Sequence, residues 1–404
     1  MVTSRRRSRL WPSLMMLLIV MGYVWYALAR SLPALQPTHL SLSLPITTTS
    51  GSFSWPADGQ TAVGIVGDSA ITSHGSQKPI ATASTAKLIT ALTVLHVKPL
   101  TTDLHGPMLT LSAHDVALYR EYVAKDGSVV GVADGEQISE YQVLEAMLLP
   151  SANNLSDSLA EWAFGSLANY SAYANKYIVS LGLKHTHVGS DASGFSGSTT
   201  STASDLVRLG QLVMQQPALK TIVAKPSASG LPVVGTIHNV NQILGVNGVI
   251  GIKTGNNTQD PGVFLGAARV PVNGQHPIIV TALLGSSSLW QAMHDSLGLI
   301  KSAEHNFAVQ TLIHEQSVVG EYQLPWSGTV GAAISSNLKA TVWPGETVKA
   351  TVHLQPISLT AHPGQQVGTI VTQKSLVDTP RSVPIELTSA PAPPSLWWRL
   401  THPF

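Results

Sequence analysis

A serine and a lysine three residues apart form the first pattern in this sequence that could carry out chemistry. In ATASTAKLITAL, Ser84 and Lys87 stand where an apolar run with helical spacing begins. Residues i and i+3 lie on one face of a helix, so the lysine amine can reach the serine hydroxyl and act as its base. An ordinary helix start with a solvated lysine has the same spacing, and Ser336 and Lys339 repeat it in SSNLK without such surroundings. The pair therefore needs support from elsewhere in the chain.

Two further motifs follow in order along the chain. Ser151 and Asn153, in LLPSANN, are expected at a turn between two helices. Lys253, Thr254 and Gly255, in GVIGIKTGNN, are expected at the end of an apolar strand. Glycine there lets a ligand lie close to the backbone, and lysine supplies a positive charge. The ordered set S-x-x-K, S-x-N and K-T-G is typical of the penicilloyl serine transferases, which are DD-peptidases and serine β-lactamases.

The elements that must position these motifs follow from hydrophobic periodicity. Beyond the helix that begins near Ser84, helices are expected over 140–148, 155–165, 203–214 and 290–314. Strands are expected over 61–66, 248–254, 262–270 and 277–284. Short β-rich runs are expected over 339–342, 348–354, 366–372 and 383–387. This order predicts a helical subdomain between two parts of a sheet, followed by a small all-β domain.

The N-terminus indicates the compartment. Four arginines among the first nine residues precede an apolar run over 10–29. This pattern is typical of either a signal peptide or one membrane-spanning helix. Ala27-Leu28-Ala29 has the form of a cleavage site, whereas the length of the run favours an uncleaved anchor. In both interpretations the positive-inside rule places everything after Arg30 outside the cytoplasm.

These patterns divide the chain into five parts. We expect a signal peptide or membrane anchor (1–30), a Pro/Ser/Thr-rich linker (31–54), a catalytic domain (55–316), a β-rich C-terminal domain (317–390) and a Trp-containing tail (391–404). Trp397 and Trp398 in the tail have two open interpretations, which are anchoring at a membrane interface and packing against a domain.

Composition excludes several classes of function. The 23 basic and 22 acidic residues nearly cancel, and only 11% of residues are charged, which argues against a nucleic-acid partner. The absence of cysteine excludes a thiol nucleophile, a disulfide framework and a thiolate zinc site. His185 and His187 lack a third ligand nearby and are expected to be loop residues. We therefore expect neither a metal nor a cofactor.

From about residue 55 to its C-terminus, the chain resembles the low-molecular-weight D-alanyl-D-alanine carboxypeptidases. The matching text comprises DGSVVGVADGEQISEYQVLEAMLLPSANN at 126–154, LGL at 181–183, TASDL at 202–206, HNVNQILGVNGVIGIKTG at 238–255 and VGTI at 367–370. The Trp-rich tail is similar to the membrane-touching end of that family. The resemblance implies an α/β fold of the DD-peptidase/β-lactamase type. In this fold a mainly antiparallel sheet flanked by helices joins an all-helical lobe, with the cleft between them, and a small all-β domain follows.

The resemblance also implies the reaction. Ser84 would be the acylated nucleophile, Lys87 its general base, and Ser151 the relay of a proton to the leaving amine. The enzyme would remove the terminal D-alanine from peptidoglycan stem pentapeptides, and β-lactams would inhibit it. It would act in the bacterial cell envelope, on the extracytoplasmic face of the cytoplasmic membrane. If the N-terminal segment is cleaved, it would be secreted.

Five residues are implied in substrate binding. Asn153 would orient the proton network and the substrate, and Lys253 would supply positive charge. Thr254 would bind the substrate carboxylate, and Gly255 would leave room for it. The backbone N–H groups of Ser84 and Asn256 would form the oxyanion hole.

Two alternatives share the three motifs. A serine β-lactamase of one large class needs a Glu in an E-x-x-L-N loop, but the only Glu between Asn153 and Lys253 is Glu161, followed by WAFGS. That class is disfavoured, while β-lactamases without this Glu remain open. A β-lactam sensor that binds without turnover also remains open.

Other features point to different classes or depart from the family. Gly67-Asp68-Ser69 is similar to the nucleophile motif of GDS esterases, but no D-x-x-H follows, so Ser69 is expected to be a turn residue. The family often has Asp where this chain has Asn154, and Thr or His where residues 256–258 read Asn-Asn-Thr.

Overall fold

The computed structural model describes residues 10–39, 41–47, 51–100, 105–256, 262–326, 328–374 and 376–402. The chain forms two compact units. We call the first the α/β unit; it consists of Thr49–Ala308 and Val342–Glu346. We call the second the β unit; it consists of Met1–Thr48, Val309–Thr341 and Thr347–Phe404. The three motifs all lie in the α/β unit.

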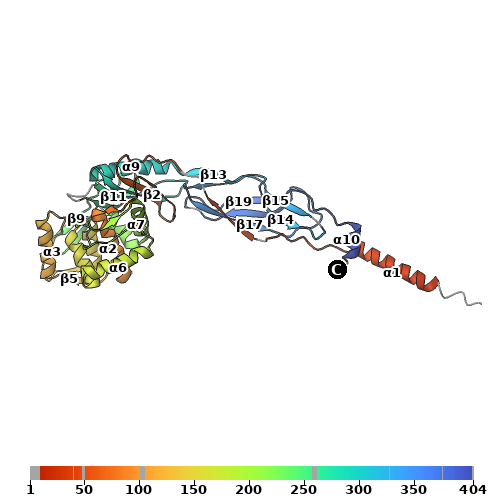
Figure 1. Ribbon diagram of the computed structural model, residues 1–404, viewed down its shortest axis with the longest axis horizontal. Helices are drawn as coiled ribbons and strands as arrows, with labels where there is room; N and C mark the ends of the chain where they lie inside the picture. The colour runs from red at the N-terminus through yellow and green to blue at the C-terminus, as the bar shows by residue number, and fades with distance from the viewer. Residues whose placement is uncertain are drawn as a thin grey trace, which may run out of the picture. The chain divides into compact units, whose positions relative to one another are not determined.

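The centre of the α/β unit is a five-stranded antiparallel sheet in the order β10-β11-β12-β2-β3. Its strands are β2 (Gln60–Ile65), β3 (Ile71–His74), β10 (Val249–Gly255), β11 (Gly262–Arg269) and β12 (Ile278–Ser286). Successive residues of β12 face opposite sides. Thr281 hydrogen-bonds Ser296 of α9 (Leu289–Glu304) at 2.7 Å, whereas Val280 packs into the core shared with α7 (Ala203–Gln215). Figure 1 shows α9 and α7 on opposite sides of this sheet.

Most other helices of the unit form a helical lobe around one hydrophobic core. They are α2 (Ala86–Val97) with the short 3-10 helix η1 (Ala83–Thr85) before it, α3 (Ala113–Ala124), α4 (Glu140–Leu148), α5 (Asn153–Phe164), α6 (Leu167–Ser180) and α8 (Pro217–Val223). A second 3-10 helix is η2 (Val246–Gly248). Short antiparallel pairs are β4 (Ile80–Ala81) with β7 (Thr200–Ser201), β5 (Met108–Thr110) with β6 (Gln137–Ser139), and β8 (Ser227–Leu231) with β9 (Gly235–His238). A mainly antiparallel sheet flanked by helices, with a helical lobe, confirms the expected fold class.

Helices α5 and α6 are separated by a clear stop signal. Gly165 has a left-handed backbone, with φ +80°, and ends α5. The Ser166 side chain then accepts from the backbone N–H of Asn169 and begins α6. Residues 140–180 therefore contain one helix, α6, that the periodicity does not predict.

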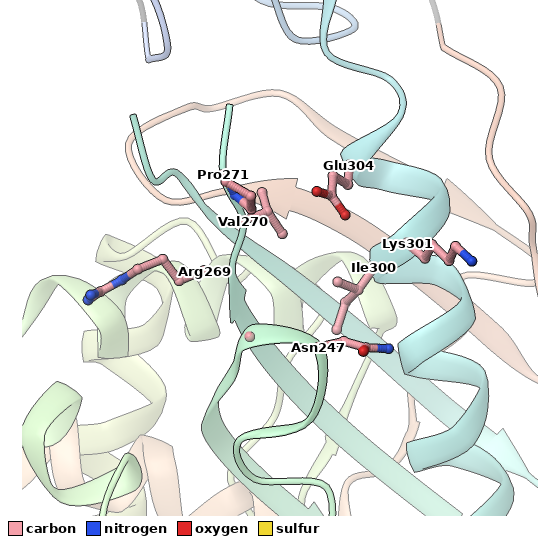
Figure 2. Close-up of a pocket in the computed structure, with 8 residues that line it drawn as sticks. Asn247, Arg269, Val270, Pro271, Ile300, Lys301 and Glu304 are labelled. Carbon is pink, nitrogen blue, oxygen red and sulfur yellow. The ribbon is translucent and has the colours of Figure 1, made fainter. Parts of the chain in front are cut away.

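A cavity of about 400 Å³ lies where β11 ends beside the last turns of α9. Figure 2 shows the side chains of Arg269 and Lys301 extending in opposite directions from it. Its charged groups therefore do not converge on one ligand.

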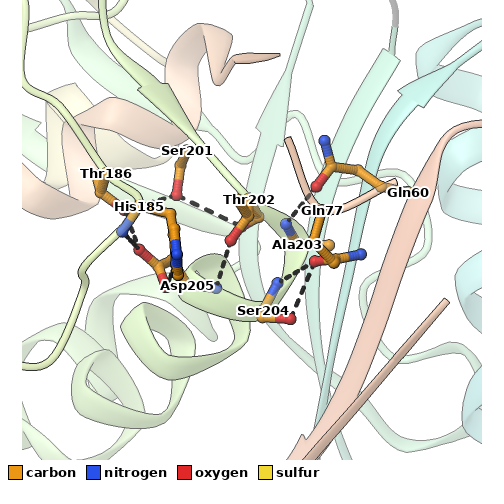
Figure 3. A network of polar contacts seen from close by, with 9 residues as sticks. All are labelled: Gln60, Gln77, His185, Thr186, Ser201, Thr202, Ala203, Ser204 and Asp205. Carbon is orange, nitrogen blue, oxygen red and sulfur yellow. Dashed lines mark hydrogen bonds and ion pairs between the residues drawn. The ribbon is translucent and has the colours of Figure 1, made fainter. Parts of the chain in front are cut away.

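The N-terminus of α7 is capped by side chains from distant segments (Figure 3). Gln60 Oε1 accepts from the Ala203 N–H at 2.9 Å, and Gln77 Oε1 accepts from the Ser204 N–H at 3.1 Å. Thr202 Oγ1 accepts from the Asp205 N–H at 3.1 Å. Three N–H groups that a helix start leaves unpaired are thus satisfied.

The β unit is built on a six-stranded antiparallel sheet in the order β1-β17-β18-β19-β15-β14. The elements of the unit are α1 (Leu10–Ala29), β1 (Ser41–Thr47), β13 (Ala308–Ile313), β14 (Val318–Gln323), β15 (Thr329–Ile334), β16 (Leu338–Val342), β17 (Thr347–Leu354), β18 (Gln366–Thr372), β19 (Ser382–Leu387) and α10 (Leu396–Thr401). Alternate residues of β17 are buried, as expected for strands with one face on a core. This unit confirms the expected C-terminal β domain.

Three expected boundaries differ from the structure. Within the range 31–54, expected to be a linker, β1 pairs with β17. The expected helix over 290–314 ends at Glu304, because residues 308–313 alternate β-branched side chains and form β13. Residues 342–346 belong to the α/β unit although they lie beyond the expected end of the catalytic domain at 316.

Candidate active site

Ser84 and Lys87 face each other across one turn of backbone. Ser84 lies half-buried in η1, and Lys87 lies in the first turn of α2. The Lys87 Nζ is 2.9 Å from the Ser84 Oγ, within hydrogen-bond distance. The Lys87 side chain is 0% exposed, so its amine is not a solvated helix lysine.

The S-x-N motif enters the site from the turn between α4 and α5. Pro150 does not continue α4, and Ser151 has a left-handed backbone with φ +70°. Asn153 begins α5, and its Oδ1 accepts from the Lys87 Nζ at 2.6 Å. The motif therefore contacts the Lys87 amine directly through Asn153.

The K-T-G motif enters from β10, which is an edge strand of the sheet. Buried Lys253 donates from its Nζ to the Ser151 Oγ at 3.0 Å and to the Thr254 carbonyl at 3.1 Å. A Cβ on Gly255 would lie 3.1 Å from the Thr82 carbonyl and 3.3 Å from the Ala83 Cβ. Glycine therefore lets the end of β10 approach the turn that carries the serine.

Two buried amines shape the electrostatics of the site. Burial lowers the pKa of Lys87 to about 7, although Asp191 and Asp157 nearby raise it in part. Burial, and then the charge of Lys87, lower the pKa of Lys253 well below its usual range. A neutral Lys87 is thus accessible near neutral pH and can accept a proton from a hydroxyl.

A small cavity of about 60 Å³ opens beside Ser84. It is lined by Ala83, Ser84, Lys125, Asp126, Gly127, Ser128, Asn153, Gly194, Phe195 and Asn256. The structure thus brings the residues of all three motifs together in one region, with Ser84 and exposed Asn256 on the same cavity. Residues 257 and 258 lie outside the described residues.

Sequence reasoning missed several residues of this region. The Ser193 carbonyl accepts from the Lys87 Nζ at 3.1 Å. Gly194 packs against the serine turn so closely that a Cβ would lie 2.1 Å from the Ala83 carbonyl. Asn154 donates to the Val130 carbonyl at 2.9 Å and accepts from the Val130 N–H at 3.2 Å, which an aspartate could not do with both partners. Asn154 was noted in the sequence only as a departure from the family, and no sequence signal pointed to Ser193 or Gly194.

The residues that suggested other kinds of site make structural contacts away from Ser84. Glu161, the only glutamate in the sequence between Asn153 and Lys253, hydrogen-bonds His114 on α3 at 2.8 Å. Asp68 accepts from the Ala70 N–H at 3.1 Å in the turn after β2, as expected for the segment around Ser69. The His185 backbone N–H donates to Asp205 (Figure 3). The 400 Å³ cavity of Figure 2 is lined by none of the motif residues.

The second S-x-x-K copy has a different setting. Ser336 and Lys339 are both exposed, and Lys339 lies on β16 and not on a helix. Ser336 precedes this strand, so no helical turn brings its hydroxyl and the Lys339 amine onto one face. This copy therefore lacks the geometry of a nucleophile and its base.

Comparison with known proteins agrees with this geometry. A family model described as D-alanyl-D-alanine carboxypeptidase matches residues 59–283. The chain belongs to the D-alanyl-D-alanine carboxypeptidase family. Within this family, the carboxypeptidase DacB2 of Mycobacterium tuberculosis is 32% identical over 161 residues, covering 39% of this chain and 54% of that protein. DacD of Salmonella typhimurium is 26% identical over 226 residues, covering 53% and 55%. The chain thus spans about half the length of these curated relatives.

Solved structures share the fold of this family member. A DD-transpeptidase of Streptomyces is similar with a TM-score of 0.55 and 21% identity, covering 63% of this chain and 98% of that one. A peptidoglycan synthesis regulatory factor of Streptococcus pneumoniae is similar with a TM-score of 0.56 and 17% identity, covering 83% and 99%.

Proposed function

We propose that this family member is a serine-type D-Ala-D-Ala carboxypeptidase that removes the terminal D-alanine from peptidoglycan stem pentapeptides. One observation carries the proposal: a fully buried lysine amine lies 2.9 Å from a serine hydroxyl at the mouth of a cavity. β-Lactams would acylate the same serine and so inhibit the enzyme.

In the acylation step, neutral Lys87 takes the proton of the Ser84 hydroxyl. The Ser84 Oγ attacks the carbonyl carbon of the scissile D-Ala-D-Ala bond, and the N–H groups of Ser84 and Asn256 stabilise the oxyanion. A donor of this type lowers the barrier by about 2.7–4 kcal/mol. Asn153 holds the Lys87 amine in place through its 2.6 Å hydrogen bond.

Collapse of the tetrahedral intermediate breaks the C–N bond. The proton held by Lys87 passes to the leaving amine of D-alanine through the Ser151 hydroxyl, whose position is maintained by the 3.0 Å contact with Lys253. Water then attacks the acyl carbonyl carbon and gives a proton to Lys87. As the bond between this carbon and the Ser84 Oγ breaks, Lys87 passes the proton to the Oγ 2.9 Å away, which releases the shortened peptide and restores the Ser84 hydroxyl and the neutral amine.

The terminal carboxylate of the substrate binds at the end of β10. The Thr254 hydroxyl donates to it, the Lys253 charge attracts it, and Gly255 leaves space beside the backbone. Because burial and the Lys87 charge lower the pKa of Lys253, an arriving carboxylate favours protonation of Lys253. Substrate binding is thus accompanied by proton uptake.

The enzyme works at the extracytoplasmic face of the membrane. Residues Trp11–Ala29 are long and apolar enough to cross a membrane, although a signal sequence has the same character. In the β unit, Arg399 of α10 donates to the Leu28 carbonyl at the end of α1, and Leu396 and Trp397 are exposed. These contacts support α10 as an interfacial anchor beside the end of α1.

Vesicle flotation tests this attachment. Full-length protein should float with phosphatidylglycerol-containing vesicles, and protein lacking residues 1–30 should float only weakly, through its C-terminal tail. Changing Trp397 to Ser in the truncated chain should remove residual binding. Equal flotation of the full-length and doubly altered chains would contradict membrane attachment.

Covalent labelling tests the catalytic site. Labelled penicillin should modify Ser84, as mapped by mass spectrometry, and Ser84→Ala should abolish the label. Ser336→Ala is the matched control and should leave labelling unchanged, since Ser336 lies in the second S-x-x-K copy. Label on another serine would overturn the site assignment.

Product analysis then distinguishes the enzyme classes. A peptide ending in D-Ala-D-Ala should release D-alanine, and the penicilloyl adduct should be long-lived because Glu161 is engaged with His114. Rapid penicillin turnover without D-alanine release would indicate a β-lactamase. A stable adduct without D-alanine release would indicate a sensor.

A further inference from the structure

The third acceptor of the Lys87 amine belongs to a segment that the motifs do not include. The amine donates to the Ser193 carbonyl at 3.1 Å, in addition to its contacts with Ser84 and Asn153. Ser193 lies in the segment 191–196, Asp-Ala-Ser-Gly-Phe-Ser, between α6 and β7. We call residues 191–196 the lysine-support loop.

Asp191 organises this loop from within. Its carboxylate accepts from the Ser193 N–H at 2.9 Å, the Ser193 hydroxyl at 2.7 Å, and the Phe195 and Ser196 N–H groups, each at 3.1 Å. Burial raises the pKa of this carboxyl, but the hydrogen bonds from Ser196 and Ser193 outweigh burial and leave it lowered. Asp191 is therefore a charged residue that folds the loop.

Asp157 ties the loop to α5. Its Oδ1 accepts from the Ala192 N–H at 2.9 Å, and its Oδ2 accepts from the Tyr122 hydroxyl at 2.6 Å. On the other side, Thr90 of α2 donates to the Ala192 carbonyl at 2.6 Å. The backbone of Ala192, directly before the residue that accepts from Lys87, is thus held from α5 and from α2.

The position of Asp157 links it to the S-x-N motif. Asp157 follows Asn153 by four residues on α5, so both side chains face the same direction. Asn153 contacts the Lys87 amine directly, and Asp157 reaches it through the loop. Among the ion pairs of the described residues, none involves Lys87, so the Asp157 carboxylate acts at longer range.

We propose that Asp157, supported by Tyr122, is a positioning residue for acylation. It holds the lysine-support loop so that the Ser193 carbonyl fixes the Lys87 amine beside Ser84, and its charge sets the pH range in which that amine accepts a proton. This inference rests on the proposed function, in which Lys87 is the base.

The charges around Lys87 give the direction of the effect. The titratable groups packed near it are Asp157 on α5, Asp191 in the loop, Tyr122 on α3 and Lys253 on β10. Burial raises the pKa of Asp157 to about 6, in spite of the hydrogen bonds from Tyr122 and Ala192. At neutral pH the ionised Asp157 favours a protonated Lys87. Loss of this charge lowers the pKa of the amine, so acylation persists to lower pH.

The test is the pH profile of penicillin acylation in Asp157→Asn. Asparagine can still accept from the Ala192 N–H, so the loop keeps its anchor while the charge is removed. The acidic limb should move to lower pH by about one unit. Asp157→Ala removes the anchor as well and should lower the acylation rate by about 10–100-fold even at the plateau.

A matched control separates charge near Lys87 from charge in general. Asp205 is also a buried carboxylate that holds a loop, by accepting from the His185 N–H at 2.7 Å and the Thr186 hydroxyl at 2.8 Å (Figure 3). Asp205→Asn should not shift the pH profile of penicillin acylation. A second variant, Tyr122→Phe, removes a donor to Asp157 and so raises the pKa of that carboxyl. Tyr122→Phe should therefore move the acidic limb of the acylation profile to lower pH, as Asp157→Asn does.

The outcomes are distinct. A parent chain that is not acylated at Ser84 would refute the proposed function. An acylated parent with folded Asp157→Asn or Tyr122→Phe variants whose acidic limbs coincide with the parental limb would overturn this inference alone. If Asp157→Asn does not fold, as judged by circular dichroism, the Tyr122→Phe profile decides.

Discussion

At the scale of single residues, Lys87 differs from an ordinary helix lysine because its amine has no access to water. Lys87→Arg should abolish acylation at neutral pH, because a guanidinium keeps its proton in a protein. Removal of a general base typically lowers the rate by about 10²–10⁴-fold. Stopped-flow acylation by a chromogenic β-lactam measures this loss. Lys339→Arg, in the exposed copy of the motif, is the control and should have no effect. A folded Lys87→Arg protein that acylates at the parental rate would contradict the base assignment.

The lowered pKa of Lys87 also predicts the sign of the pH dependence. In the proposed mechanism the neutral amine is the active form, so acylation should rise as the pH increases through about 7, the pKa of Lys87. An unperturbed lysine would give the same rise near pH ~10.4. Burial, and then the charge of Lys87, lower the pKa of Lys253, so the two amines are coupled and the measured pKa belongs to the pair. A rate that stays flat from pH 5 to pH 9 would argue against an amine base.

At the scale of elements, the site depends on a close approach of three backbones: η1, the end of β10 and the lysine-support loop. Gly194→Ala should disturb this approach, because its φ of +75° disfavours a side chain and its Cβ would lie 2.1 Å from the Ala83 carbonyl. We expect a loss of more than about 2 kcal/mol in the free energy of unfolding, together with slower acylation of Ser84.

A second glycine provides the control for Gly194. Gly230 in β8 has φ +83°, but a Cβ there would meet nothing within 4 Å. Gly230→Ala should therefore lose only the backbone preference, about 1–2 kcal/mol, and acylate at the parental rate. Denaturant unfolding and penicillin labelling on both variants make the comparison. Equal effects of the two substitutions on acylation would contradict a steric role for Gly194.

At the scale of the whole molecule, the α/β unit is completed by a segment from far along the chain. Trp343 is 0% exposed, and its ring lies 5.6 Å from that of Phe53 and 5.1 Å from that of Phe307. Trp343→Ala should lower the free energy of unfolding of this unit by about 3–5 kcal/mol, because it leaves a cavity among the aromatic rings.

An exposed tryptophan of the same unit is the control for Trp343. Trp290, on α9, is 60% exposed, and Trp290→Ala should change stability by less than about 0.5 kcal/mol. Guanidinium unfolding of both variants measures the difference. A chain ending at residue 316 should be destabilised like Trp343→Ala, and parental stability of that truncated chain would refute the role of this segment.

The sequence by itself determined the features that depend on short spacings. The i, i+3 relation of Ser84 and Lys87 is a property of any helix, and the proline before Ser151 and the glycine after Thr254 determine local backbone geometry. Strand periodicity likewise predicted β18 with its bounds, while the fold class was implied by the resemblance that the three motifs and the matching text carry. Helix α3 was missed because its apolar periodicity is weak, and α9 was expected to continue to residue 314, where the alternating β-branched residues 309, 311 and 313 instead belong to β13.

Only the tertiary structure decided the features that join distant residues. The pairing of β1 with β17, the insertion of Trp343 beside Phe53, and the support of Lys87 by the Ser193 carbonyl each connect segments whose separation carries no periodic signal. Asp157 stands four residues after Asn153, so a helix places both on one face. That this face meets a loop folded around Asp191 follows from packing, since burial forces each backbone N–H and carbonyl to find a partner wherever the fold brings one.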